Sequence, residues 1–133
     1  MLISRHFIVS LILAIALFSV YKWLSLLVFV FGFLIDVDHY LWYILKFNSF
    51  SLKKAYHHSL NHAERDPINE DVLHIFHVLE IWIPIFILGF FNNVFFILSV
   101  GLAIHLLMDF IECIRNNEYY ARTFSLFTWI TRN

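Results

Sequence analysis

Long apolar runs separated by short polar breaks dominate this chain, and they cover about residues 7–21, 23–47, 74–91 and 94–111. Because an α-helix rises by about 1.5 Å per residue, a run of about 20 residues crosses the hydrocarbon layer of a membrane. The pattern therefore predicts four transmembrane helices. Short turns join them in pairs, and a long polar loop over residues 48–73 connects the two pairs.

Three local features refine this prediction. The first run follows Arg5, as the apolar part of a signal peptide would, but no small-residue cleavage site follows it, so we interpret it as a span. Pro84 lies inside the third run and predicts a kink there. Residues 119–130 mix aromatic residues with Arg122, which is typical of a helix lying at a membrane surface. The expected fold is a single all-α domain, an integral membrane four-helix bundle with a C-terminal interfacial helix.

The distribution of positive charge predicts an orientation. With four spans, both termini and the long loop lie on one side, and Lys22 is the only one of nine lysines and arginines that falls on the other. Cytoplasmic segments of membrane proteins carry an excess of these residues. We therefore expect a multi-pass protein of the plasma membrane with both termini in the cytoplasm.

Composition supports this class and excludes others. The chain is 61% hydrophobic and only 14% charged, which leaves too little polar surface for a soluble domain of this size. A net charge of −1 gives no indication of nucleic acid as a partner, whereas membrane lipids are expected partners. Cys113 is the single cysteine, which excludes an internal disulfide and a cysteine-rich zinc site.

Ionisable side chains of the types that bind metals lie inside or at the ends of the apolar runs. They are Asp36, Asp38, His39, His74, His77, Glu80, His105 and Asp109. A charged group near the centre of a bilayer costs at least ~2.5–3.5 kcal/mol, so such residues persist when they are paired, coordinated or functional. The expected topology places these residues of the second, third and fourth spans in the same cytoplasmic third of the bilayer, which predicts one shared site.

The spacing and chemistry of these residues indicate a metal site. Asp36 and His39, His74 and His77, and His77 and Glu80 are each three residues apart, and His105 and Asp109 are four apart, so each pair shares one face of a helix. Imidazole and carboxylate ligands without thiolate suit Zn²⁺, Fe²⁺ or Mn²⁺. We expect one or two divalent ions, with Zn²⁺ favoured, and Asp38 either binds a second ion or orients a ligand.

Other interpretations of the same residues remain open. His6 or His74 alone can be an interfacial histidine, and His105 with Asp109 can be a hydrogen-bonded pair that only fixes packing. The whole set can also form a structural polar network, or a path for protons or ions. In the loop, His57, His58 and His62 can supply further ligands, a general base or a substrate clamp, or can simply be solvated.

Three of these segments resemble the predicted membrane-bound metal-dependent hydrolases, a bacterial and archaeal family of small helical proteins. The shared elements are Asp-x-Asp-His at residues 36–39, the histidine and glutamate run at 74–82, and His-x-x-x-Asp at 105–109. The tail at residues 121–126 is also similar, and the resemblance covers roughly residues 28–130. It implies a divalent metal site and hydrolase activity.

The primary functional prediction is an integral membrane hydrolase that acts on a lipid or lipid-linked phosphoester or ester near the cytoplasmic face. A metal held by histidines and carboxylates activates a bound water, with Glu80 or Asp38 as the catalytic general base. The alternative is a transport or binding protein for metal ions or protons. A helical di-iron carboxylate oxidoreductase is less favoured, because His77 and Glu80 form the only histidine–glutamate pair at that spacing within a span, and in reversed order.

Overall fold

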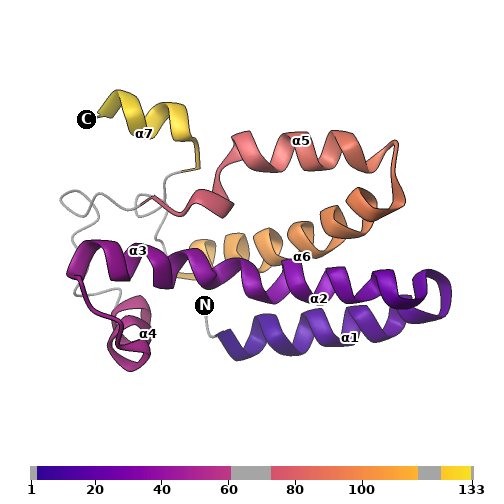
Figure 1. Ribbon diagram of the computed structural model, residues 1–133, viewed down its shortest axis with the longest axis horizontal. Helices are drawn as coiled ribbons and strands as arrows, with labels where there is room; N and C mark the ends of the chain where they lie inside the picture. The colour runs from indigo at the N-terminus through magenta and orange to yellow at the C-terminus, as the bar shows by residue number, and fades with distance from the viewer. Residues whose placement is uncertain (1–2, 61–72, 117–123, 133) are drawn as a thin grey trace.

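The computed structural model describes residues 3–60, 73–116 and 124–132, and every regular element in these ranges is helical (Figure 1). The all-α prediction is therefore confirmed for the described residues. In chain order the elements are α1 (Ile3–Tyr21), η1 (Lys22–Ser25), α2 (Leu26–Phe33), η2 (Leu34–Asp36), α3 (Val37–Phe47), α4 (Leu52–Leu60), η4 (Ile75–His77), α5 (Leu79–Gly89), α6 (Asn93–Asn116) and α7 (Leu126–Arg132).

The first two apolar runs form an antiparallel helical hairpin (Figure 1). The chain reverses at Lys22, whose φ of 51° lies in the left-handed region. The second arm is not one uniform helix, because a 3₁₀ turn, η2, separates α2 from α3 and ends at Asp36. Helical turns of this kind within a long helix often mark functional positions.

Two helical stretches, Ser4–Phe47 and Asn93–Arg115, are long and apolar enough to cross a membrane. The first of them contains both arms of the hairpin described above. The second is α6, which continues beyond the predicted end of the fourth run to Asn116.

The third run is shorter as a helix than the sequence predicted. Helix α5 has 11 residues, or about 16 Å of length, against a hydrocarbon layer of about 30 Å. The reason lies at its start, where His74 and Val78 have extended backbones and only η4 between them is helical. The predicted helix over residues 74–91 therefore begins at Leu79, and the expected loop contains a helix of its own, α4.

Small residues let the central helices approach closely. Helix α2 packs between α1 and α6, and α5 covers the other side of α6. A Cβ atom on Gly32 would meet Ser10 Oγ of α1, and one on Gly101 would lie 2.7 Å from the carbonyl oxygen of Val28. Such close backbone contacts are common between helices in membranes. They bring the polar residues of α1, η2 and α6 within reach of one another.

The surface of the described chain is rich in large apolar side chains. Ile12, Ile15 and Val20 on α1 are 61%, 66% and 70% exposed. Phe90 and Phe91, at the turn between α5 and α6, are more than 80% exposed. Both hairpin turns lie at one end of the molecule, while α4 and α7 lie at the other (Figure 1).

Candidate metal centre

Four of the predicted ligands meet at one point. Asp36 ends η2, His77 ends η4, and His105 and Asp109 lie one turn apart on α6. We call these four residues the ligand cluster. One ligand atom of each residue lies within 4.8 Å of the ligand atoms of the other three. The side chains of His77, His105 and Asp109 are almost fully buried.

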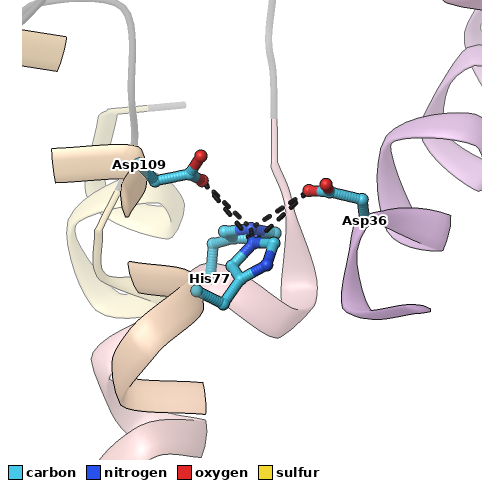
Figure 2. Close-up of side chains that lie close together, drawn as sticks. Asp36, His77 and Asp109 are labelled. Atoms are coloured by element: carbon cyan, nitrogen blue, oxygen red, sulfur yellow. Dashed lines mark hydrogen bonds and ion pairs between the residues drawn. The ribbon is translucent and has the colours of Figure 1, made fainter. Parts of the chain in front are cut away.

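Five of the six distances within the ligand cluster are close to those around a tetrahedral ion, and the sixth, between the two carboxylate oxygens, is within 4.8 Å. The Nε2 atoms of His77 and His105 are 3.0 Å apart. Asp36 Oδ1 lies 3.8 and 3.4 Å from these two nitrogens, and Asp109 Oδ2 lies 3.5 and 3.6 Å from them. Figure 2 shows the two carboxylates directed at His77 from opposite sides. Ligand atoms bound at about 2.0–2.1 Å to a tetrahedral zinc are separated by roughly 3.3 Å, so the arrangement fits a single ion.

Hydrogen bonds outside the ligand cluster determine which imidazole nitrogens are bare. His105 Nδ1 lies 3.1 Å from the carbonyl oxygen of Gly32, which can only accept, so this nitrogen carries the proton. His77 Nδ1 likewise donates to Asp38 Oδ2 at 3.0 Å. In the neutral rings both Nε2 atoms are then unprotonated, and two lone pairs face each other beside two carboxylate oxygens. A divalent cation there would bind all four ligand atoms and balance both carboxylate charges.

Asp38 orients a ligand in this structure. Its Oδ2 accepts hydrogen bonds from His77 Nδ1 and from the backbone N–H of Phe76, both at 3.0 Å. Its Oδ1 pairs with His39 Nδ1 at 2.7 Å. A carboxylate that holds the second nitrogen of a metal-binding histidine is a common feature of metal sites. Of the two roles that the sequence left open for Asp38, these contacts favour the orienting one, and they do not favour Asp38 as a general base.

His6, for which the sequence favoured an interfacial position, lies at the site. Its side chain is almost fully buried, and its Nε2 lies 3.3 Å from Asp109 Oδ1, the oxygen that does not face the other ligands. The ring also stacks on His105 with centroids 4.2 Å apart. The available signal was depth in the membrane, since the expected topology places His6 at the cytoplasmic end of its span, on the same side as the other candidates.

A second group contains Asp38, His39 and His74. The rings of His39 and His74 are stacked, with centroids 3.6 Å apart and planes 16° from parallel. Because the lone pair of an imidazole nitrogen lies in the ring plane, two nearly parallel rings do not direct their lone pairs at one point. This group therefore fits a second ion less well than the ligand cluster fits the first.

Glu80 does not lie in either group. Its carboxylate accepts hydrogen bonds from Ser125 Oγ at 2.6 Å and from the backbone N–H groups of Leu126 and Phe127. Through these hydrogen bonds, Glu80 holds the start of α7 against α5. The expected helical spacing from His77 to Glu80 fails because Val78 is extended, which turns Glu80 away from the face that holds His77. Its predicted roles as ligand and general base are not supported by this placement.

The histidines of the predicted loop lie apart from the ligand cluster. His57 and His58 belong to α4, and the ring of His58 contacts the aromatic side chains of Trp42, Tyr43 and Phe47 on α3. His62 lies outside the described residues. The structure therefore gives His58 a packing contact and brings neither His57 nor His58 to the metal ligands that it describes.

A cavity of about 450 Å³ opens beside the ligand cluster. His74, His77 and Asp109 form its polar edge, and apolar side chains from α5, α6 and the segment before α7 form its walls. A molecule in this cavity would contact two of the four ligands directly.

Replacing His6 with phenylalanine is expected to weaken metal binding roughly 10–100-fold, the usual effect of losing a group that orients a ligand. His6→Phe keeps a ring against His105 but removes the nitrogen that faces Asp109. Titration of the purified protein with Zn²⁺ measures the change. Ser10→Ala is the matched control, because Ser10 is buried one turn away and its Oγ has no hydrogen-bond partner among the described residues. Equal affinities for all three proteins would contradict the assigned role.

No protein-family model, curated protein or solved structure matches this chain. The resemblance to membrane-bound metal-dependent hydrolases therefore stays a prediction. The assignment of a candidate metal centre rests on the convergence of Asp36, His77, His105 and Asp109 itself.

Proposed function

We propose that this protein is an integral membrane hydrolase that uses a divalent metal to cleave a lipid or lipid-linked ester or phosphoester near the cytoplasmic face. The observation that supports this most directly is the ligand cluster, in which the Nε2 atoms of His77 and His105 lie 3.0 Å apart, at the edge of a largely apolar cavity. A structural ion alone does not need such a cavity, whereas a site for a lipid does.

The surface supports the membrane location. Exposed apolar side chains cover α1, α2 and α6. An extended apolar surface of this kind marks a site of contact with lipid or with a partner. We propose that α1, α2–α3 and α6 cross the bilayer, that α5 enters it from the side of α6, and that α7 lies at the interface. The end that carries α4 and α7 then faces the cytoplasm, in agreement with the excess of lysine and arginine in those segments.

Zn²⁺, Fe²⁺ or Mn²⁺ suits the donor set of two imidazoles and two carboxylates. Because four protein ligands fill a tetrahedral shell, the hydrolytic water would have to bind as a fifth ligand. An ion that held it there would lower the pKa of that water and polarise the oxygen of an ester. His77 and Asp109 line the cavity, so they would hold the ion from that side and a substrate in the cavity would approach it there. We propose that Asp38 and His6 keep His77 and Asp109 in place, and that His74, at the polar edge of the cavity, moves the proton between water and the leaving group.

The test is lipid hydrolysis by the protein in liposomes. The starting material is membranes washed at alkaline pH, and loss of the protein into the wash would contradict the membrane location. We expect release of phosphate or fatty acid from mixed lipids that a chelator abolishes and that Zn²⁺, Mn²⁺ or Fe²⁺ restores. Glu112→Gln is a control for altered charge, because Glu112 pairs with Arg5 outside the ligand cluster.

Two results would overturn the hydrolase proposal. One is the absence of product from every lipid tested with metal-loaded protein. The other is a flux of ions through the liposomes that a chelator does not affect, which would favour the transport alternative.

A further inference from the structure

The side chains that line the cavity beside the ligand cluster indicate which kind of molecule binds there. Apart from His74, His77 and Asp109, it is lined by Leu79, Trp82, Leu106, Leu107, Phe110, Cys113 and Phe124. We propose that this cavity binds one hydrocarbon chain of a lipid, with the ester end of that chain at His77 and Asp109. The inference rests on the proposed function, since it names the part of the substrate that this site recognises.

The volume of the cavity suits a single chain. A group of the size of water or methylene occupies roughly 30 Å³ in a condensed phase, so about 450 Å³ has room for at least roughly 15 such groups. That is enough for one ordinary fatty acyl chain.

The walls of the cavity provide apolar contacts for a hydrocarbon chain and few hydrogen-bonding partners for a polar group. The indole of Trp82 is the obvious polar group among the walls away from the ligands, and its Nε1 already donates to the carbonyl oxygen of Phe76 at 3.0 Å. Its ring therefore presents apolar surface to the cavity. A polar head group placed among these walls would lose its hydrogen bonds to water without replacement. The head group would instead lie at the polar edge of the cavity.

The cavity also opens where a lipid can reach it. Leu107 and Phe110 of α6 line it and are 52% and 54% exposed. In the proposed orientation this face of α6 contacts the bilayer. A lipid chain can then slide sideways between α5 and α6 without leaving the apolar layer.

Cys113 provides a built-in reporter for this proposal, because it is the only cysteine of the chain, is buried, and lines the cavity. The experiment measures the rate of its alkylation by N-ethylmaleimide, by intact mass, in a sterol-based detergent that has no alkyl chain. Lysophosphatidylcholine with a chain of about 14 carbons, at about ten times its dissociation constant, is expected to slow alkylation about tenfold. Glycerophosphocholine, the same head group without a chain, is expected to have no effect.

A pair of matched variants distinguishes the cavity from the general apolar surface. Leu107→Trp narrows the cavity, whereas Ile114→Trp adds the same side chain to an exposed position of α6 that does not line it. The ratio of rates with and without lipid should fall towards one in Leu107→Trp and stay unchanged in Ile114→Trp. The length of the best-protecting chain should also become shorter in Leu107→Trp.

Cross-linking gives a second readout that does not depend on thiol reactivity. Lysophosphatidylcholine with a diazirine at the end of its chain should label residues 106–113 of the wild-type protein, as located by mass spectrometry of fragments. Labelling confined to other segments would overturn the proposal, and so would equal protection by glycerophosphocholine or full protection in Leu107→Trp.

These measurements need no turnover, so they separate the inference from the hydrolase proposal. Protection by lipid without any hydrolysis would leave the chain-binding cavity in place and overturn the proposed reaction. Chelator-sensitive hydrolysis without protection or labelling at the cavity would do the reverse.

Discussion

Replacing His105 and Asp109 together with alanine is expected to remove the metal from the purified protein. The two residues supply two of the four ligand atoms, and the 3.6 Å between His105 Nε2 and Asp109 Oδ2 would let one turn of α6 hold an ion through both. Loss of a ligand weakens binding more than loss of an orienting group, which typically costs about 10–100-fold. Elemental analysis of the detergent-purified protein should therefore show metal in the wild type and essentially none in the variant.

The control for this result removes the same chemical groups elsewhere. His57→Ala with Glu112→Ala deletes one imidazole and one carboxylate, and neither residue belongs to the ligand cluster. This pair should keep its metal. Equal metal content in the His105 and Asp109 variant and in the wild type would contradict the site, provided both elute as the same species in size-exclusion chromatography.

Replacing Gly101 with alanine is expected to lower both the thermal stability and the metal affinity of the protein. The added Cβ would lie 2.7 Å from the carbonyl oxygen and 3.0 Å from the Cα of Val28, so backbone and not a side chain must move. Overpacking of this kind costs about 1–3 kcal/mol, more than the roughly 1 kcal/mol that alanine gains over glycine within a helix. Separating α2 from α6 also lengthens the 3.4 Å distance between Asp36 and His105.

Gly89→Ala makes the same chemical change at the α5–α6 contact. Its added Cβ would meet Ser99 Oγ at 3.1 Å and the Cα of Phe96 at 3.3 Å, which small shifts can relieve. The midpoint of thermal unfolding should fall clearly further for Gly101→Ala than for Gly89→Ala. A Gly101→Ala protein with unchanged midpoint and metal affinity would show that α2 and α6 are not as close as the structure places them.

The helical elements were largely predictable because long apolar runs have few alternatives to helix. Depth along those runs also identified all four members of the ligand cluster, since Asp36, His77, His105 and Asp109 converge as expected. What periodicity could not show was a local break in the helix. The extended backbone at Val78 shortens α5 and directs Glu80 to the start of α7. The residue types around Val78 do not predict this extended conformation.

The contribution of α1 was harder to predict for a different reason. His6 stands alone near the start of its run, and a single histidine at the end of a span is usually interfacial. Only the packing of α1 against α2 and α6, made possible at Gly32, brings it to Asp109. The role of Asp38 likewise depends on tertiary contacts, because its partners Phe76 and His77 lie 38 and 39 residues away in the chain.

One oxygen of Asp38 holds both the backbone of Phe76 and the ring of His77. Asp38 therefore preorganises His77, although the extended residue Val78 separates this ligand from helix α5. Because these contacts form on folding, the entropy lost in ordering that segment is a cost of folding and not of metal binding.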